Sequence, residues 1–315
     1  MSAPPDHPLG YRLRRLVGSG RTAHVYEAES PLYGTVALKL PRDELERDPV
    51  LRRMFENEVQ MTLALSHPRI VAALAGYPTG AGAHLALEFC EGSLDAALGE
   101  PLPLASAYRL ALDVAQGLAH SHERGIVHRD VKPANVFVKA GRAKLGDFGT
   151  GFFIGDAFSG EAQRARVGTA FYMAPETFRG ASASPKTDLY SLGVLAYELI
   201  AGRRPFTGET ADELMLAHTS GVPLSLRHHR PEVSPEVSRV VATAMAYDPE
   251  KRYESVRAFV LAFAAATGLP PDDPPPALGR SSRRPHLPLQ PGGADAPPEE
   301  PLPKGRFGWL GRRRS

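Results

Sequence analysis

The chain has 315 residues, of which 43% are hydrophobic and 23% charged, an ordinary composition for a globular protein that does not span a membrane. This length allows one large two-part domain with a tail, or two small domains. The formal net charge of +2 gives no indication of nucleic-acid binding, and the single cysteine, Cys90, excludes an internal disulfide.

No targeting or membrane segment is apparent in the sequence. Residues 1–10 are polar and lack the apolar stretch of a signal peptide. The longest apolar runs, 191–201 and 258–266, are too short to cross a bilayer. We therefore expect a cytoplasmic protein with a flexible N-terminus at 1–10, no transmembrane segment and no nucleic-acid partner.

The first part of the chain, residues 11–89, has the pattern of a small sheet with one helix. Short β-type runs separated by glycine-containing turns predict strands at 12–17, 25–28, 35–40 and 84–89. Apolar side chains four positions apart predict a helix over 51–65, and these side chains are Leu51, Phe55, Val59 and Leu63.

The second part, residues 94–267, is predicted to be mainly helical. Apolar spacing predicts a helix over 104–124, and the nearly all-apolar run 189–201 predicts a buried one. Residues 210–213 have the pattern of a capping box that opens another helix, and the last helix is predicted over 255–267. Short strands are predicted at 126–128, 136–138 and 143–145.

The composition changes after residue 267. Residues 268–315 hold 12 of the 30 prolines and few large apolar side chains, so they cannot bury a core. We expect a Pro/Arg-rich disordered or polyproline-like tail there. The Phe-Gly-Trp-Leu motif at 307–310 has two interpretations, part of a solvated basic end or a short docking motif for a partner or a membrane surface, and both stay open.

The densest group of chemically active residues lies at 128–135 and 147–149, with the sequences H-R-D-V-K-P-A-N and D-F-G. These segments supply two carboxylates, Asp130 and Asp147, together with a lysine and an amide. Phosphoryl transfer from a nucleotide to a hydroxyl needs one carboxylate at the attacking oxygen, and a second carboxylate and an amide to hold Mg²⁺. The pattern therefore predicts phosphoryl transfer.

Four further motifs occur in a fixed order around this group. They are the glycine-containing stretch 18–25, the sequence V-A-L-K at 36–39, Glu58 nine residues before His67, and G-T-A-F-Y-M-A-P-E at 168–176. With these motifs the chain resembles the eukaryotic-like (bacterial-type) serine/threonine protein kinase family over about residues 11–267.

The resemblance implies an α+β, bilobal protein kinase fold. It implies a small antiparallel β-rich N-lobe with one helix at 11–89, a hinge at about 88–93, and a larger, mainly helical C-lobe at 94–267. It also implies ATP and Mg²⁺ as cofactors, with Mn²⁺ as an alternative ion. The acceptors would be Ser or Thr hydroxyls on protein substrates, in bacterial signalling.

The resemblance also implies roles for single residues. Asp130 would be the catalytic base, or would orient the substrate hydroxyl, and Lys132 would neutralise charge on the γ-phosphate. Lys39 would hold the α- and β-phosphates while paired with a helix carboxylate. Glu58 is the candidate for that carboxylate, and Glu56 is the alternative.

Nucleotide and metal would be held by a further set of residues. By the same resemblance, Asn135 and Asp147 would bind Mg²⁺. Leu87 would be the gatekeeper, and the backbone of Glu88 and Cys90 would bind adenine. The other implied nucleotide contacts are Leu16, Gly18, Ser19, Gly20, Val25, Ala37 and Lys39.

Some residues of these motifs are expected to have structural roles. Glu176 would pair with Arg252 inside the C-lobe, and Asp188 would anchor the backbone of the 128–135 loop. His128 and Phe148 would pack so that the two carboxylates are positioned.

The activation loop departs from the usual family pattern. Arg129 would normally meet a phosphorylated residue, but Ser159 is the only plausible site, because Thr150 lies too close to the metal-binding motif. We therefore hypothesise that the loop is held without phosphorylation, by Asp156 or Glu161 near Arg129, or by a partner.

Two other functions compete with a protein kinase. A pseudokinase would bind nucleotide and partners without phosphotransfer, but Lys39, Asp130 and Asp147 are all intact. A small-molecule kinase of related fold generally lacks the A-P-E sequence that this chain has at 174–176. A protein that only binds partners through its Pro-rich tail would not need these motifs, although the tail could bind partners in addition to kinase activity.

Overall fold

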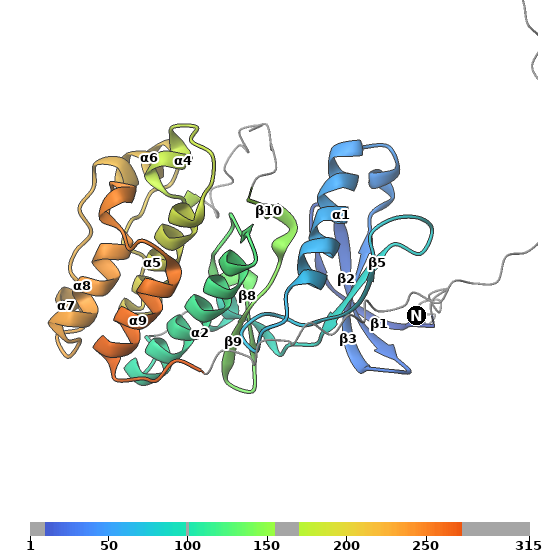
Figure 1. Ribbon diagram of the computed structural model, residues 1–315, viewed down its shortest axis with the longest axis horizontal. Helices are drawn as coiled ribbons and strands as arrows, with labels where there is room; N and C mark the ends of the chain where they lie inside the picture. The colour runs from blue at the N-terminus through green and yellow to red at the C-terminus, as the bar shows by residue number, and fades with distance from the viewer. Residues whose placement is uncertain (1–9, 99–100, 155–169, 273–315) are drawn as a thin grey trace, which may run out of the picture. The chain divides into compact units, whose positions relative to one another are not determined.

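Five antiparallel strands and one long helix form the first part of the chain (Figure 1). The computed structural model describes residues 10–98, 101–154 and 170–272, and all of them belong to one compact unit. The strands lie in the order β1-β2-β3-β5-β4, with every neighbouring pair antiparallel. Their bounds are β1 (Arg12–Ser19), β2 (Ala23–Ser30), β3 (Gly34–Pro41), β4 (Ala73–Tyr77) and β5 (His84–Glu88). All predicted strands of this part are present, and β4 is additional.

Helix α1 (Pro49–Ala64) packs against β4 and begins where Asp48 caps it with its side chain. Phe55 and Val59 are buried, as the spacing predicts, but Leu63 is 46% exposed. Residues four apart advance about 40° beyond a full turn of a 3.6-residue helix. Repeated steps of four therefore carry the last residue of the predicted stripe away from the buried face.

Helices make up most of the second part of the chain. Their bounds are α2 (Leu104–Glu123), α4 (Pro175–Phe178), α5 (Pro185–Ala201), α6 (Ala211–Ser220), α7 (Leu226–His229), α8 (Pro235–Ala244) and α9 (Val256–Thr267). Every residue of α5 from Thr187 onward is buried, as predicted for an apolar helix. Helices α2, α8 and α9 pack against it (Figure 1).

The capping interactions differ in one place from the predicted pattern. The Thr210 hydroxyl accepts the N–H of Glu213, but the Glu213 carboxylate accepts the N–H of Glu209 instead of returning to Thr210. The predicted capping box is therefore only half formed. A complete one opens α5, between Ser184 and Thr187.

Two short sheets and several 3₁₀ turns fix the loops between the lobes. Strands β6 (Gly92–Ser93), β8 (Val136–Lys139) and β9 (Arg142–Leu145) form one sheet, and β7 (Ile126–Val127) pairs with β10 (Phe152–Phe153). The 3₁₀ turns are η1 (Asp43–Glu46), η2 (Leu94–Ala97), η3 (Pro133–Asn135), η4 (Phe148–Thr150) and η5 (Pro249–Lys251). Because the 128–135 and 146–151 loops begin and end at these strands, the motif residues are held from both sides.

Buried apolar side chains form several clusters, and the largest of them also includes Met61 of α1. The largest cluster lies among α2, α5, α8 and α9. A smaller cluster, with Phe55 and Leu85, lies between the sheet and α1, and another, with Val36 and Leu38, lies within the sheet. This arrangement confirms the expected α+β, bilobal fold of a β-rich N-lobe with one helix and a helical C-lobe.

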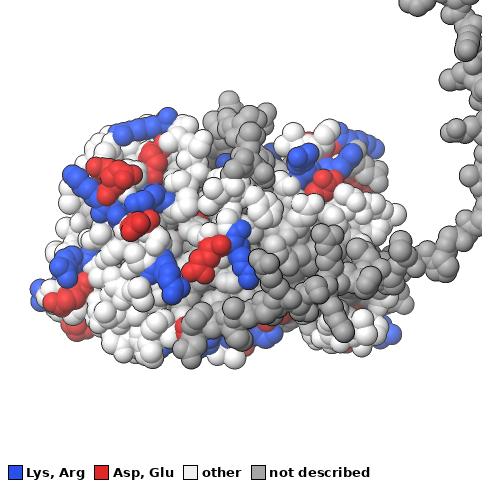
Figure 2. All heavy atoms as spheres, viewed as in Figure 1, with Lys and Arg blue, Asp and Glu red and all other residues white. Residues whose placement is uncertain are grey.

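Charged side chains of both signs are interspersed on the face of the C-lobe that Figure 2 shows. This distribution agrees with the near balance of 37 Lys and Arg against 35 Asp and Glu in the whole sequence. Among the helices within 10–98, 101–154 and 170–272, none combines the length and apolar character that a bilayer span requires.

The structure corrects the start of the predicted disordered tail. Gly268, with φ +69°, ends α9, and disorder was predicted from this residue onward. Instead, Leu269 packs against the C-lobe core, and Asp272 forms ion pairs with Arg69 and Arg142. Local composition predicted disorder because it contains no information about arginines that face the segment from distant parts of the chain.

Candidate active site

Lys39 lies at the centre of a charged cluster between the two lobes. Its Nζ donates a hydrogen bond to Glu58 Oε1 and another, of 2.8 Å, to Asp147 Oδ1. Lys39 comes from β3, Glu58 from α1 and Asp147 from the loop after β9. The predicted contact of Lys39 with Glu58, rather than with Glu56, is therefore present.

Burial and charge act in opposite directions in this cluster. The side chains of Lys39 and Glu58 are only 14% and 2% exposed. Burial alone would lower the pKa of Lys39, but the charges of Asp147 and Glu58 outweigh it and raise that pKa. The charge of Lys39 lowers the pKa of Asp147 to about 2, whereas burial raises the pKa of Glu58 in spite of Lys39. Lys39 and Asp147 are consequently both charged at neutral pH.

Asp130 is fixed by its neighbours within the 128–135 loop. Lys132 Nζ and Asn135 Nδ2 donate hydrogen bonds of 2.7 and 2.9 Å to Asp130 Oδ2. The N–H of Asp130 donates to His128 Nδ1 at 3.2 Å. The other carboxylate oxygen, Oδ1, is buried and accepts no hydrogen bond from any residue that the structure describes. One oxygen of Asp130 is thus held in place while the other remains an acceptor.

The backbone of this loop is held from helix α5. The Asp188 side chain is 1% exposed, and its two oxygens accept the N–H groups of His128 and Arg129, each at 2.8 Å. Asp188 Oδ2 also lies 2.8 Å from Nε2 of His122. Arg129 has φ +72°, in the left-handed region that non-glycine residues rarely adopt. The expected anchoring of the loop by Asp188 is confirmed, and the anchor is attached at a strained residue.

Asp147 also has a left-handed backbone, with φ +58°. The next residue, Phe148, is fully buried, and its ring centroid lies 4.7 Å from that of His128. At Gly149, an added Cβ would lie 3.1 Å from Glu58 Oε2, so the absence of a side chain lets α1 approach. The expected packing of His128 and Phe148 is present, and it turns the Asp147 carboxylate toward Lys39.

The glycine-containing stretch forms the end of the β1–β2 hairpin. Gly18 lies opposite Val25, and Val25 lies opposite Lys39 on β3. Gly20 begins the turn, where its N–H donates to the carbonyl of Ala23 at 2.8 Å. The same strand β1 carries the predicted contacts Leu16 and Ser19. The register thus places Val25 directly beside Lys39 and Gly18 one strand further away.

An apolar cluster lies at the predicted hinge. Ala37 pairs with Leu87 across β3 and β5, and both belong to one cluster with Cys90. Phe137 of β8 packs against the same cluster. The position of Phe137 at the hinge was not predicted from the sequence, because one aromatic residue in a short strand gives the same signal as an ordinary core residue.

Glu88, at the end of β5, connects the lobes through its side chain. Its carboxylate accepts hydrogen bonds of 2.7 Å from Lys139 and from Lys144. The N–H of Glu88 donates to the carbonyl of Ala72 at 2.9 Å. A role in binding adenine would therefore fall to the carbonyl of Glu88. The ion pairs of Glu88 with Lys139 and Lys144 were not predicted from the sequence.

Asn135 and Asp147, the residues predicted to hold Mg²⁺, are joined through the backbone. The carbonyl of Asn135 accepts the N–H of Gly146 at 2.9 Å, directly before Asp147. Both hydrogen bonds from Asn135 Nδ2 go to Asp130, so Oδ1 is left as an oxygen ligand. In the part of the chain that the structure describes, no group of three or more His, Cys, Asp or Glu could hold a metal. This donor set fits Mg²⁺, which commonly takes one or two protein ligands and completes its shell with phosphates and water.

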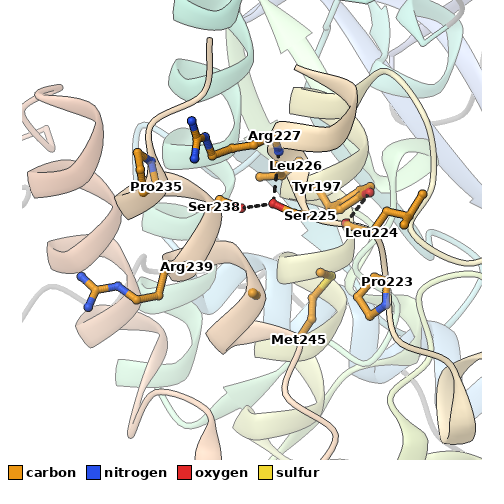
Figure 3. A pocket seen from close by; sticks show the side chains of 11 residues that line it. Tyr197, Pro223, Leu224, Ser225, Leu226, Arg227, Pro235, Ser238, Arg239 and Met245 are labelled. Carbon is orange, nitrogen blue, oxygen red and sulfur yellow. Dashed lines mark hydrogen bonds between the residues drawn. The ribbon is translucent and has the colours of Figure 1, made fainter. Parts of the chain in front are cut away.

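A separate cavity of about 410 Å³ lies in the C-lobe, among α5, α7 and α8 (Figure 3). Tyr197 and Met245 line its apolar wall, and Arg227 and Arg239 are also among its lining residues. None of the predicted site residues lines it. The cavity is therefore separate from the candidate active site.

Some predictions concern residues outside those that the structure describes. They are the N-terminus before residue 10, residues 168–169 at the start of the 168–176 motif, the activation-loop residues Asp156, Ser159 and Glu161, and the predicted tail over 273–315 with its motif at 307–310. The hypothesis of an activation loop held without phosphorylation therefore stays a prediction, as does docking through the tail.

Comparison with known proteins agrees with this geometry. The protein kinase domain family matches residues 11–261. The chain is 34% identical to serine/threonine-protein kinase PknB of Mycobacterium tuberculosis over 316 residues, covering 96% of this chain and 50% of PknB. It is 35% identical to serine/threonine-protein kinase pkn2 of Myxococcus xanthus over 279 residues, covering 84% of this chain and 34% of pkn2.

A solved structure is similar as well. The crystal structure of the Mycobacterium tuberculosis PknI kinase domain has a TM-score of 0.62 and 27% identity, and it covers 85% of this chain and all of that chain. The chain spans about half the length, or less, of the curated relatives it matches. By its fold, its motifs and these relatives, the chain belongs to the protein kinase domain family and is related to bacterial serine/threonine kinases.

Proposed function

We propose that this chain transfers the γ-phosphoryl group of ATP, with Mg²⁺ or Mn²⁺, to serine and threonine hydroxyls of proteins. The observation that carries the proposal is the meeting of Lys39, Glu58 and Asp147 in one cluster, beside a loop that holds Asp130 with one acceptor oxygen left over. The acceptor class follows from the names of the relatives, which are serine/threonine-protein kinases.

Asp130 is the residue that receives the substrate hydroxyl. Its Oδ2 is fixed by Lys132 and Asn135, so its Oδ1 accepts the hydroxyl hydrogen and orients the oxygen for in-line attack. The fixed carboxylate loses little conformational entropy when the substrate binds. Lys132, which lies within hydrogen-bond distance of Asp130, neutralises charge that develops on the transferred group.

Lys39 holds the nucleotide phosphates. Because Glu58 and Asp147 keep its ammonium group charged and in place, Lys39 presents a fixed cation to the phosphate oxygens. Glu58 acts only through Lys39, so it is a positioning residue. Apolar side chains at Ala37 and Leu87 would form walls of the adenine site.

Lys39 alone cannot balance the charge of the bound phosphates, because it already faces two carboxylates. When bound, Mg²⁺ would supply positive charge at the phosphates, and Asn135 and Asp147 are the residues that would hold it. Since ATP is the donor, we place the activity in the cytoplasm, where ATP is available.

The test is a γ-labelled ATP assay with Mg²⁺ on the full chain, with a generic basic protein as acceptor. We expect label on serine or threonine in the parent and at least a hundredfold lower turnover for Asp130→Asn, with ATP affinity within about twofold of the parent. Asp43→Asn removes the same charge from an exposed site and is the matched control.

Each result of this assay has a separate meaning. Absence of label in the parent together with ATP binding would replace the proposal with a nucleotide-binding pseudokinase. Equal labelling by parent and Asp130→Asn would remove Asp130 from its assigned role. Label on tyrosine would overturn the acceptor class.

A further inference from the structure

Two carboxylates and two guanidinium groups form a cluster outside the candidate active site. Asp113 on α2 has a fully buried side chain, and Arg142 on β9 donates to both of its oxygens, at 2.9 and 2.7 Å. Asp272, beyond α9, accepts hydrogen bonds from Arg69 and, at 3.1 Å, from Arg142. The cluster thus contains equal numbers of positive and negative groups.

A short segment of chain brings Asp272 to this place. Leu269 packs against the C-lobe core directly after α9. Two side chains of α2 then hold the backbone: Arg109 donates to the carbonyl of Pro270 at 3.1 Å, and Gln116 to that of Asp272 at 3.2 Å. In Figure 1 this orange-red segment leaves α9 and runs beside α2 toward β9. Residues 269–272 therefore form a strap across α2, and this strap lies beyond residue 261, where the family match ends.

Arg69, which the strap holds, belongs to the 65–71 loop that directly follows α1. The backbone of this loop is fixed on β9, where Leu145 donates to the carbonyl of Arg69 and Val71 donates to the carbonyl of Leu145, both at 2.9 Å. A Cβ added at Gly117 of α2 would lie 2.4 Å from the carbonyl oxygen of Arg69, so the loop also touches α2 closely. This loop is consequently the place where α1 is attached to the C-lobe.

The attachment affects the Lys39 cluster because α1 carries Glu58. Glu58 lies within the last two turns of α1, whose final residue, Ala64, accepts a hydrogen bond from Arg124 of the C-lobe. A helix transmits displacement of its end as a nearly rigid body, so a shift of the 65–71 loop moves Glu58 relative to Lys39.

We propose that Asp272 is a positioning residue for phosphotransfer: by holding Arg69, it fixes the 65–71 loop and keeps α1 where Glu58 meets Lys39. This inference rests on the proposed function for its kinetic consequence, but its structural consequence can be measured without any activity.

The surrounding charges explain why no neighbouring carboxylate can take over the role of Asp272 as the partner of Arg69. The Arg69 side chain is 12% exposed, and its next carboxylate, Asp113, lies 3.6 Å away. Asp113 already accepts two hydrogen bonds from Arg142 and one from the N–H of Ala143. Without the carboxylate of Asp272, Arg69 is left as a largely buried cation with a weaker partner, so it moves toward water and the loop moves with it.

The test uses the full chain and the variants Asp272→Asn and Asp272→Glu. Glu123→Gln is the matched control, because it removes one carboxylate at the end of α2 from an exposed pair with Arg257. Hydrogen exchange measured by mass spectrometry compares residues 49–71 with α5 and α8. Steady-state kinetics gives kcat and the KM for the phosphoacceptor.

We expect Asp272→Asn to exchange at least three times faster over 49–71, with α5 and α8 unchanged. We expect its kcat to fall at least threefold while the KM for the phosphoacceptor stays within twofold. Asp272→Glu should restore at least half of each change, and Glu123→Gln should show neither.

Several outcomes would overturn the inference. They are exchange and kcat equal to those of Glu123→Gln, faster exchange in α5 and α8 as much as in 49–71, and no recovery in Asp272→Glu. A parent chain without phosphotransfer would refute the proposed function instead, and exchange over 49–71 would then decide alone whether Asp272 positions α1.

Discussion

The carboxylate of Asp188 accepts the backbone N–H of Arg129 at 2.8 Å, at a residue whose φ is +72°. A non-glycine residue in the left-handed region costs roughly 1–2 kcal/mol. Hydrogen bonds to a buried carboxylate are strong enough to offset that cost. Since Arg129 directly precedes Asp130, helix α5 sets the direction in which Asp130 faces.

This relationship predicts the effect of Asp188→Asn. An amide has one oxygen to accept an N–H, and its NH₂ group would face the second N–H, so the loop loses one of its two anchors. We expect kcat to fall about tenfold or more and the free energy of unfolding to fall by about 2–4 kcal/mol. Urea unfolding and turnover measurements check this, with exposed Asp212→Asn as the control. Parent-like turnover in Asp188→Asn would contradict it.

The Lys39 cluster predicts a pH dependence of stability. Because the folded pKa of Asp147 is lowered to about 2, from an ordinary value of 3.8, its stabilising contribution is complete above about pH 4 and is lost as the pH falls toward 2. Lys39→Met removes the main cause of that shift. The free energy of unfolding should therefore decline less steeply between pH 4 and pH 2 in Lys39→Met than in the parent.

Urea unfolding at a series of pH values between 2 and 5 measures this difference. Lys251→Met, at an exposed lysine, is the matched control and should follow the slope of the parent. Parallel slopes for the parent and Lys39→Met would show that Lys39 does not stabilise the Asp147 carboxylate.

Arg252 forms the expected ion pair with Glu176, and it also donates hydrogen bonds to backbone carbonyls. Its guanidinium is fully buried, donates to both Glu176 oxygens at 2.6 and 2.8 Å, and donates to the carbonyls of Lys186 and Ala246 at 2.9 and 2.7 Å. An ammonium group cannot match this planar set of donors. Arg252→Lys should therefore lower the free energy of unfolding by about 3–5 kcal/mol. Arg257→Lys, in an exposed pair, should change it by less than about 0.5 kcal/mol; similar losses in both variants would argue against the prediction.

Cys90 is predicted to be unreactive. Burial, followed by the charge of Glu88, raises the pKa of its thiol to about 11. The thiolate is the nucleophilic form, so at pH 7.5 alkylation by iodoacetamide should be about a hundred times slower than in the urea-unfolded chain. Mass spectrometry over time measures both rates. A folded-state rate within threefold of the unfolded rate would refute the prediction.

Much of the fold could be predicted because its causes are local. Glycine-containing turns between β-type runs located the strands around Lys39, and apolar spacing located α1 and α5. The spacing of four predicted the burial of side chains less well than it predicted the helix itself. Each step of four advances beyond a full turn, so Leu63, at the end of the series, lies off the buried face. The contacts Lys39–Glu58 and Arg252–Glu176 could be predicted only because the motifs resemble a family, since no local pattern connects residues so far apart.

The remaining contacts had no signal in the sequence. Arg69 and Asp272 are 203 positions apart, and a single ion pair at that separation leaves no periodicity. Glu88 with Lys139 and Lys144 is a similar case. In both, side chains that look like ordinary surface charges become partners only after the lobes have folded together.

The strap at 269–272 has a practical consequence for anyone who isolates this domain. A recombinant fragment ended at residue 261, where the family match stops, would omit the last turns of α9 as well as Asp272. Weak activity of that fragment would then be mistaken for evidence that the proline-rich region activates the enzyme. Ending the fragment after residue 272 separates the two explanations, because it keeps the carboxylate on Arg69 and removes everything that follows.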